Sequence, residues 1–379
     1  MKISEDKYVC AHYIGKYLPL TENWIYKLIS NHKEFLPLVI TRKTVNLQNF
    51  PFSPIFELYK ANLIKLSYNF LVFKSLGFFP GFARFCKEKK ADILHVHFGY
   101  HGLKSIGLKK KLKIPMVCSF YGDDAFSWIQ KEWYKKKIVH LFNEADRILV
   151  LGEYMKSGLM KLGCPEEKIR IQHLGVNLKE IRFEERIYSK DKPFNFLIAS
   201  SFVPKKGVDI ALRALSEIGD RIEYKVHIIG GGELESEIHG LVKELKMDEK
   251  VKFYGYQPYK IFLDLSYKCD AFLSASRTGE ANQKEGTPMA LVDVMATGLP
   301  VVSTFHSDIP EIVLDGETGY LAKENDVEDF ARAILAFVGD FKNNRDLTKK
   351  ARKHIEENFN AEIQTLKLEK IYSEVLNTK

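Results

Sequence analysis

The chain has 379 residues and a formal net charge of +8. This length exceeds the ~100–200 residues of a usual single domain, and it predicts two domains that each bury a core. Hydrophobic residues make up 45% of the chain and charged residues 28%, a balance that excludes a disordered or fibrous protein.

The charge is distributed unevenly between the two halves. Residues 1–190 contain 32 Lys or Arg against 18 Asp or Glu, a net charge of +14, whereas residues 191–379 contain 25 against 31, a net charge of −6. We therefore expect the first half to face an anionic partner.

The chain lacks the patterns of a secreted or membrane-spanning protein. Its cysteines are few and far apart, so we expect buried, reduced thiols. They are Cys10, Cys86, Cys118, Cys164 and Cys269. The most apolar region, 70–85, is interrupted by charge and proline before it reaches the ~18 residues of a spanning helix. We expect a soluble, cytoplasmic protein, either free or peripheral at the inner face of the membrane.

Short apolar runs alternate with helical segments along the chain, which is typical of α/β units around parallel sheets. The first half predicts strands at 8–13, 36–40, 93–97, 116–120 and 147–151. The second half predicts strands at 194–199, 225–229, 251–254, 271–274 and 301–303. A charged stretch without apolar period lies between the two series. We therefore expect an N-terminal domain over 1–180, a linker over 181–193 and a C-terminal domain over 194–359.

The segment 284–300 carries the most informative pattern. Thr287 is a good helix N-cap, Pro288 suits the first helical position, and Gly298 suits the residue after the last turn. Glu285 precedes this helix, and Asp293 in its second turn is expected to lean back toward the same mouth. Two carboxylates beside a helix N-terminus suit a ligand that is part polyol and part phosphate. An acidic loop with a surface Asp is the plainer alternative.

Two glycine-containing loops follow predicted strands of the second half. Lys205, Lys206 and Gly207 open a helix and predict a phosphate site, although loop lysines are more often simply solvated. The run 230–232 is Gly-Gly-Gly, but Glu235 breaks the GxGxxG spacing, so a nicotinamide-binding site is disfavoured.

At these residues the chain resembles retaining family-4 glycosyltransferases. The C-terminal motifs are Glu-Gly-x-Pro at 285–288, Ala-Thr-Gly-x-Pro at 296–300 and Asp-Gly-x-Thr-Gly at 315–319. The N-terminal motifs, His-x-His-Phe-Gly at 95–99 and Ser-Phe-Tyr-Gly-Asp at 119–123, are similar to the branch that builds exopolysaccharide, capsule and colanic-acid-type chains. The resemblance implies the GT-B fold, two Rossmann-like domains that face each other across a cleft, with a C-terminal helix, 360–379, that returns to the first domain.

The resemblance also assigns residues. It gives Glu285, Lys206, Asp123 and His97 to catalysis, although a packed core histidine is an equal alternative for His97. Positions that match the donor-binding residues are Gly15, Ser201, Lys206, Gly231, Tyr256, Glu285, Gly286, Thr287, Pro288, Met289, Ala290 and Asp293.

Three positions depart from the family pattern. Asp293 stands where the family usually has Glu, Ser201 where it has Arg, and Tyr121 where it commonly has His near the reacting sugar. Arg277 is the candidate for the missing cation.

The resemblance implies a hexosyltransferase that moves a sugar, with retention, from a UDP- or GDP-sugar to a saccharide or lipid-linked saccharide. Fixed cations and helix N-termini would stabilise the departing diphosphate. No Asp-x-Asp pair or clustered ligand set is visible, so we expect no metal and no cofactor besides the nucleotide sugar. A nucleotide-sugar binder without turnover and an epimerase of the same fold are alternatives, whereas the basic residues lack a recognisable nucleic-acid module.

Lysine clusters at 109–113 and 128–137, the second with tryptophans, predict contact with anionic headgroups or an ordinary solvated face. The apolar region 70–85 predicts either an acceptor channel or plain packing.

Overall fold

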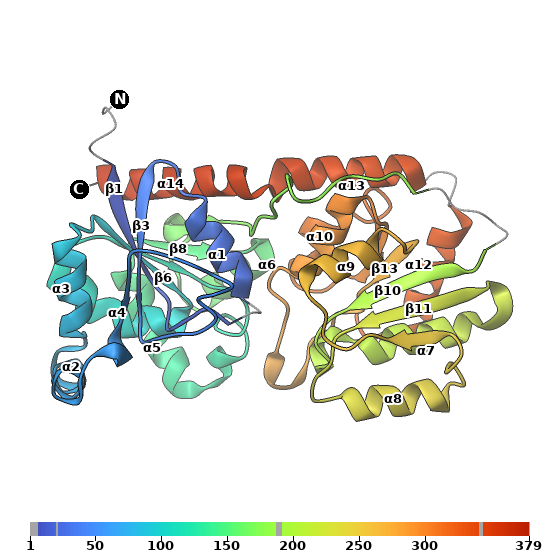
Figure 1. The fold of residues 1–379 in the computed structure, drawn as a ribbon, viewed down its shortest axis with the longest axis horizontal. Helices are drawn as coiled ribbons and strands as arrows, with labels where there is room; N and C mark the ends of the chain where they lie inside the picture. Colours follow the sequence, from blue (N-terminus) through green and yellow to red (C-terminus); the bar gives the residue numbers. More distant parts are fainter. Residues whose placement is uncertain (1–6, 20–21, 187–191, 341–343, 379) are drawn as a thin grey trace. The chain divides into compact units, whose positions relative to one another are not determined.

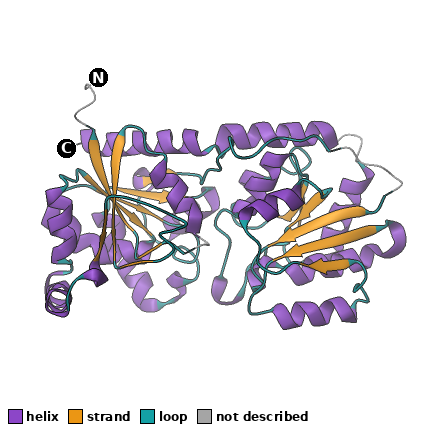
Figure 2. Cartoon of the chain, in the orientation of Figure 1, coloured by secondary structure: helices purple, strands orange, loops and turns teal. Residues whose placement is uncertain are grey.

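The computed structural model describes residues 7–19, 22–186, 192–340 and 344–378, and the chain divides into two units (Figure 1). Unit 1 comprises Met1–Gly175 and Ala361–Lys379, and unit 2 comprises Val176–Asn360. Each unit has its own sheet with helices beside it (Figure 2). The prediction of two α/β units with parallel sheets is confirmed.

The main sheet of unit 1 has seven strands in the order β5-β3-β1-β6-β7-β8-β9, and every neighbouring pair is parallel. Strand order reverses direction between β1 and β6, which is where open α/β sheets bind their ligands. The strands are β1 (Tyr8–Tyr13), β3 (Phe35–Thr41), β5 (Ile55–Glu57), β6 (Ile93–His97), β7 (Met116–Ser119), β8 (Arg147–Val150) and β9 (Ile169–Ile171). A separate short pair joins β2 (Lys16–Tyr17) to β4 (Lys43–Thr44).

The helices of unit 1 include the last helix of the chain. They are α1 (Asn23–Ser30), α2 (Leu63–Leu76), α3 (Pro80–Glu88), α4 (Gly99–Leu112), α5 (Glu132–Glu144), α6 (Glu153–Lys161) and α14 (Ala361–Asn377). Leu368 and Tyr372 of α14 are fully buried in a core with Cys10 and Val117 of the sheet. The C-terminal helix is therefore an integral part of the first unit.

Unit 2 has a parallel six-stranded sheet in the order β12-β11-β10-β13-β14-β15, which reverses direction between β10 and β13. Its strands are β10 (Phe194–Ala199), β11 (Tyr224–Ile229), β12 (Val251–Phe253), β13 (Ala271–Leu273), β14 (Val301–Thr304) and β15 (Tyr320–Ala322). Its helices are α7 (Val208–Ile218), α8 (Glu235–Glu244), α9 (Tyr259–Ser266), α10 (Met289–Thr297), α11 (Ile309–Ile312), α12 (Val327–Gly339) and α13 (Asn344–Asn358).

Alternate residues of β10 face two separate cores, as a strand covered on both faces requires. Phe196 and Ile198 pack in the core that includes α7 and α12, whereas Leu197 packs in the core that includes α10 and Ile355 of α13. Loops at the carboxyl ends of the strands are thereby held between two rigid helical layers.

Helix α10 begins one residue later than the sequence predicts. Pro288 occupies the N-cap position and α10 starts at Met289, so Thr287 does not act as the N-cap. Pro288 cannot donate a backbone hydrogen bond, and at the cap none is required of it. The other end is as predicted, because Gly298 adopts φ 87° and ends the helix.

The expected linker packs against unit 2 over the part that is described. Ile181 is buried in a core of unit 2, and the guanidinium of Arg186 donates to the carbonyls of Ser266 and Tyr267. The division from unit 1 falls at Gly175, ahead of the expected boundary at 180. Residues 187–191 of the expected linker lie outside the described residues.

The apolar region 70–85 forms the end of α2, a turn and the start of α3. Gly77 ends α2 with φ 73°, and Phe79 and Phe82 beyond it are buried. Leu71 and Leu76 on α2 are instead exposed. All five cysteines are buried and unpaired, as predicted. Among the described helices, none combines the length and the apolar character needed to span a membrane.

Two leucines of α14 allow a matched test of how the C-terminal helix stabilises unit 1. Leu368 is fully buried and Leu366 is 47% exposed. We expect Leu368→Ala to cost unit 1 about 2–5 kcal/mol through lost burial and a cavity, and Leu366→Ala to cost less than about 0.5 kcal/mol. All three tryptophans, Trp24, Trp128 and Trp133, lie in unit 1, so tryptophan fluorescence in a urea titration follows this unit. Equal losses for the two variants would contradict the packing of α14.

Candidate functional site

A buried ion pair stands at the carboxyl ends of β10 and β13, where the sheet of unit 2 reverses direction. Lys206 Nζ lies 2.8 Å from Glu285 Oε2, and Lys205 Nζ lies 3.9 Å from Glu285 Oε1. The Glu285 side chain is 6% exposed and that of Lys206 is 21% exposed. The pair thus carries two charges that are largely removed from water.

The lysines are presented by a turn that only glycine can complete. Residues 204–206 form a 3₁₀ turn, and Gly207 follows with φ 59°. A Cβ at Gly207 would lie 1.8 Å from the carbonyl oxygen of Ala275, in addition to the strained backbone. This close approach brings the loop after β10 against the loop after β13, which carries Glu285.

The environment keeps Glu285 ionised. Burial alone would raise the pKa of this carboxyl, but the charges of Lys206 and Lys205 and the hydrogen bond from Lys206 outweigh burial and lower the pKa below its ordinary value. At neutral pH the site therefore offers a carboxylate that accepts hydrogen bonds beside an ammonium group.

A histidine and a second glutamate, neither identified from the sequence, hold the backbone of Glu285. The backbone N–H of Glu285 donates to His306 Nε2 at 3.1 Å, so the ring proton is on Nδ1 and is donated to Glu324 Oε2 at 2.7 Å. Burial lowers the pKa of His306 despite Glu324, which is consistent with a neutral ring. Their positions in the sequence could have indicated these two residues, because His306 follows β14 and Glu324 follows β15.

Asp293 lies on α10 and is buried. Its Oδ1 accepts a hydrogen bond from the hydroxyl of Tyr259 at 2.7 Å, which ties α10 to the start of α9. Burial, followed by the charge of Asp293, raises the pKa of Tyr259, so the phenol stays protonated and donates. Asp293 is therefore ordered by a neighbour that the sequence did not indicate.

The glycine run after β11 contacts the exposed ring of Tyr256, which follows β12. The backbone at Gly230 and Gly232 has φ of 137° and 151°. The hydroxyl of Tyr256 donates to the carbonyl of Gly231 at 2.7 Å, while Tyr256 as a whole is 72% exposed. A Cβ at Gly231 would lie 3.0 Å from the ring. The loop thus presents an open aromatic face beside the carboxyl end of β11.

Ser201, which stands where the family has Arg, and Arg277, the candidate replacement for that cation, both lie near the loop of Lys205 and Lys206. Ser201 is exposed. Arg277 donates from Nε to the carbonyl of Pro204 at 2.9 Å, and its guanidinium pairs with Asp209 at 3.0 Å. Arg277 therefore borders the loop, but its charge is already paired within unit 2.

The predicted donor-binding run leads directly into α10. Gly286 and Pro288 are buried, whereas Met289 and Ala290 are partly exposed in the first turn. Backbone N–H groups in a first helical turn lack partners within the helix and attract anions. Unit 2 therefore brings Lys206, Glu285 and the start of α10 to one end of its sheet.

The predicted residues of unit 1 also follow the carboxyl ends of strands. Gly15 comes after β1, and a Cβ there would lie 2.2 Å from His101 Nε2, so no side chain fits. Asp123 after β7 is exposed, and Ser127 Oγ donates to its Oδ1 at 3.3 Å. Its neighbour Asp124 is fully buried.

Asp124 organises this loop and was not singled out from the sequence. It accepts hydrogen bonds from the backbone N–H groups of Gly99, Tyr121 and Gly122 at 2.8, 2.9 and 3.1 Å. Burial outweighs these bonds and raises its pKa to about 6. The second Asp of the pair at 123–124 thus has the structural role, while the first is exposed.

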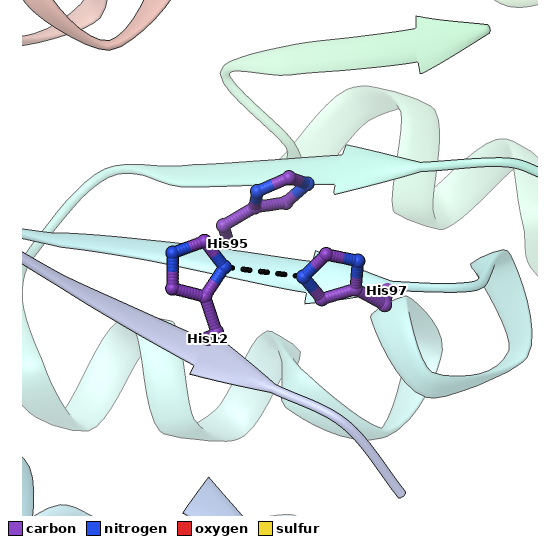
Figure 3. Close-up of side chains that lie close together, drawn as sticks. All are labelled: His12, His95 and His97. Carbon is purple, nitrogen blue, oxygen red and sulfur yellow. Dashed lines mark hydrogen bonds between the residues drawn. The ribbon is translucent and has the colours of Figure 1, made fainter. Parts of the chain in front are cut away.

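His97 is fully buried and reaches the surface only through another side chain. Figure 3 shows His97 and His95 on β6 beside His12 on β1, with His97 bonded to His12. The other ring nitrogen of His97 lies 2.7 Å from the hydroxyl of Tyr121. The structure therefore places Tyr121, which is partly exposed, between His97 and the loop region. The expected catalytic role of His97 stays a prediction, and its complete burial agrees with the packed-histidine alternative.

Two family models match the chain and together span most of it. A model described as "Glycosyl transferases group 1" matches residues 179–354, and one described as "Glycosyltransferase Family 4" matches residues 56–180. The first covers the Lys206 and Glu285 loops, and the second covers His97 and Tyr121.

Individual relatives agree with these models. The chain is 30% identical over 279 residues to the "Putative colanic acid biosynthesis glycosyltransferase WcaL" of Escherichia coli, covering 72% of this chain and 68% of that protein. It is 32% identical over 290 residues to the "Amylovoran biosynthesis glycosyltransferase AmsK" of Erwinia amylovora, covering 75% and 70%. The solved structure of Anabaena Alr3699/HepE in complex with UDP superposes with a TM-score of 0.79 at 16% identity over 97% of this chain and 100% of that chain. That match shows the fold.

The buried pair predicts an effect on stability. Lys206→Met leaves the Glu285 carboxylate with Lys205 alone, so we expect unit 2 to lose about 1–3 kcal/mol, the cost of a buried charged group without its hydrogen bond. Amide hydrogen exchange in β10 and β13 measures this loss. The double variant Lys206→Met/Glu285→Gln should recover part of it, because no unpaired charge remains. Equal losses in the single and double variants would show that Lys206 does not compensate Glu285.

The same variant reverses the sign of the pH dependence. In the natural protein the pKa of Glu285 is lowered on folding, so its contribution to stability is present above the unfolded pKa and is lost as the pH falls through the folded one. In Lys206→Met burial dominates and raises the pKa of Glu285, so its unfavourable contribution is relieved as the pH falls. Hydrogen exchange in β13 measured at several pH values distinguishes the two directions.

Proposed function

Since the chain belongs to glycosyltransferase family 4, we propose that it transfers a hexosyl group from a UDP- or GDP-sugar to a saccharide or lipid-linked saccharide during synthesis of a bacterial surface polysaccharide. The relatives that make colanic acid and amylovoran support this class of product. The UDP complex of a protein with the same fold supports a nucleoside-diphosphate sugar as the donor.

The buried Lys206–Glu285 pair is the observation that carries the proposal. Departure of a nucleoside diphosphate develops negative charge on phosphate oxygens, and an ammonium held in place stabilises that charge without reorganising. The Glu285 carboxylate beside it accepts hydrogen bonds from hydroxyls of the donor sugar. The positive end of α10 adds its dipole to the same region.

The remaining roles follow from the chemistry of each position. The exposed ring of Tyr256 offers a stacking face for the nucleobase, and Asp293, ordered by Tyr259, accepts from the ribose. His306 and Glu324 position Glu285 through its backbone. We propose that these groups act without a metal ion and with retention at the anomeric carbon, in keeping with the family resemblance.

Substitution of Glu285 tests this proposal. We expect Glu285→Gln to reduce transfer by at least ~100-fold, because the amide cannot accept at both oxygens and no longer pairs with Lys206. Glu280→Gln, an exposed neutral substitution in the same loop, is the matched control and should keep full activity.

The assay is release of UDP or GDP from a panel of nucleotide sugars, with the anomeric configuration of the product read by NMR. Tight nucleotide binding without release under any acceptor would contradict turnover and favour a binding protein. Rearrangement of the donor without acceptor would favour an epimerase. Loss of release in EDTA would contradict metal independence.

We further propose that the protein contacts an anionic membrane surface through α2. This helix is largely apolar, but Asn69 is its one buried residue. Leu63, Ile64 and Leu71 are 81%, 83% and 68% exposed. Contiguous apolar surface of this kind marks a contact site on a soluble protein.

Charge around α2 suits anionic headgroups. Residues 57–90 contain seven Lys or Arg and two acids, Glu57 and Glu88, which pair with Lys60 at 3.3 Å and with Arg84 at 3.5 Å. Lys60, Lys65 and Arg84 line a cavity of about 670 Å³ beside the helix. Cations near an exposed apolar helix suit a surface of anionic headgroups.

The two lysine clusters identified from the sequence differ in how many of their cations are paired. Lys109 pairs with Asp146 at 2.8 Å and Lys110 with Glu144 at 2.6 Å, so two cations of the first cluster are already neutralised. In the second cluster, residues 135–137 are exposed beside the half-exposed Trp133. Their neutralisation is expected to weaken membrane binding less than changes in α2.

Sedimentation with lipid vesicles tests the membrane contact. We expect the protein to sediment with phosphatidylglycerol-containing vesicles more than with pure phosphatidylcholine, and the variant Leu63→Ser/Ile64→Ser/Leu71→Ser to lose this binding. Ile363→Ser/Leu366→Ser, which changes exposed apolar residues of α14, is the matched control. Equal sedimentation with both lipids, or a dimer that dissociates in the α2 variant, would contradict the proposal.

A further inference from the structure

A continuous chain of hydrogen bonds runs through the buried histidines of unit 1. Glu369 on α14 bonds His32 after α1 (3.1 Å), which bonds His12 on β1 (3.2 Å). His12 in turn bonds His97 on β6 (3.1 Å), and His97 bonds the hydroxyl of Tyr121 (2.7 Å). We refer to Glu369, His32, His12, His97 and Tyr121 together as the histidine chain.

The histidine chain crosses the point where the sheet of unit 1 reverses direction. His12 and His95 are register partners on β1 and β6, so their side chains share one face of the sheet (Figure 3). His97, two residues further, lies on the same face. The chain therefore links the buried face beneath α14 to the loop that follows β7.

The rings are arranged for hydrogen bonding rather than for binding a metal. One nitrogen from each of His12, His95 and His97 lies within 4.8 Å of the others. However, all six ring nitrogens have partners, because His95 also bonds the hydroxyls of Tyr372 (2.6 Å) and Ser119 (2.7 Å). His97 lies nearly parallel to both other rings, at interplanar angles of 27°, so their in-plane lone pairs do not converge.

One end of the histidine chain is fixed as an acceptor. Glu369 Oε1 accepts backbone N–H groups from three consecutive residues, 33–35, in addition to His32 Nδ1. Burial alone would raise the pKa of Glu369, but these hydrogen bonds outweigh burial and lower it, so Glu369 is a carboxylate. His32 Nδ1 must therefore carry a proton and donate it.

From that fixed end, the direction of every other bond follows. Burial keeps His12 and His97 neutral by lowering their pKa values, so each has one N–H. If His32 is also neutral, its Nε2 accepts from His12 Nε2–H. His12 Nδ1 then accepts from His97 Nε2–H, and His97 Nδ1 accepts from the hydroxyl of Tyr121.

One additional proton reverses this order. If His32 carries a proton on both nitrogens, Nε2 donates to His12 and each following histidine donates from Nδ1. Tyr121 then accepts from His97, and its own hydrogen can turn toward a ligand or toward the side chain of Ser119, which also bonds it. The two arrangements have the same heavy-atom positions and differ by a single proton.

We propose that the histidine chain sets the hydrogen-bond polarity of Tyr121 toward a hydroxyl group of the bound saccharide. With His32 neutral, the Tyr121 hydroxyl accepts from the saccharide; with His32 protonated, it donates. Tyr121 is the residue that contacts ligand, and the three histidines and Glu369 are positioning residues. The identity of the ligand as a saccharide rests on the proposed function, whereas the hydrogen bonds of the histidine chain do not depend on it.

Several titratable groups surround the histidine chain, and the effects of their titration must be distinguished from those of the chain. They are Cys10 and His95 on the sheet, His101 on α4 with Arg42 near it, Tyr372 on α14, Asp124 after β7 and Glu22 before α1. Glu22 matters most, because burial raises its pKa to about 7. Glu22→Gln removes this titration and is a required control.

Nitrogen NMR of the whole protein, labelled at histidine, tests the histidine chain without any substrate. The method distinguishes Nδ1–H from Nε2–H tautomers. At every pH from about 9 to about 5, the range in which histidines titrate, we expect His12 and His97 to hold matching tautomers, both Nε2–H or both Nδ1–H. Glu22→Gln and Tyr372→Phe should leave this match intact, whereas Glu369→Gln, which removes the fixed acceptor, should change which of the two matched tautomers predominates. Independent titration of His12 and His97, or Zn²⁺ binding that His97→Gln abolishes, would overturn the proposal.

Kinetics test the consequence at Tyr121. Loss of one neutral hydrogen bond predicts a reduction in kcat/KM of up to about tenfold in Tyr121→Phe, together with loss of the pH step that we expect in the natural enzyme. Glu369→Gln should move that step, and Tyr372→Phe should not. An unchanged pH profile in Tyr121→Phe would overturn the assigned role. If the natural protein transfers no sugar at all, the proposed function is contradicted. The NMR result would still show whether the tautomers of the histidine chain are coupled.

Discussion

A polar group that is buried must find its hydrogen-bond partner inside the protein, and this requirement organises both units of the chain. In unit 2 the carboxylate of Glu285 would be costly at 6% exposure without Lys206, and its backbone N–H is held by His306. In unit 1 His12 and His97, both fully buried, share a hydrogen bond, and the network continues through His32 to Glu369. The candidate site residues are therefore held in part by buried groups, His306 in unit 2 and Glu369 in unit 1.

Both networks lie where a parallel sheet reverses its strand order, but their chemistry differs. Unit 2 uses a full charge pair between the loops after β10 and β13. Unit 1 uses neutral imidazoles between β1 and β6. A charge pair is suited to a step in which phosphate charge develops, whereas a neutral chain is suited to recognising a hydroxyl without attracting counter-ions. The strand order determines where each network lies in its sheet, and the side chains determine the chemistry of each network.

Much of this architecture was visible in the sequence, and the limits have physical causes. The ten predicted strands are present because each is an apolar run bounded by Gly, Pro or charge. The strands at 55–57, 169–171 and 320–322 were missed, and each has only three residues. Glu285 and Lys206 could be identified from local motifs. His306 and Glu324 could not, since they meet Glu285 only once β14 and β15 lie side by side, and Tyr121 shields His97 in a way that spacing does not reveal.

The histidine chain joins residues that lie 337 positions apart in the sequence, at His32 and Glu369. Translation reaches the second of these only after all of Val176–Asn360 has been made. The sheet of unit 1 must therefore wait with its histidines uncovered until α14 has been made. During that interval the nascent protein exposes an incomplete face, so its demand on chaperones falls on the half that was translated first.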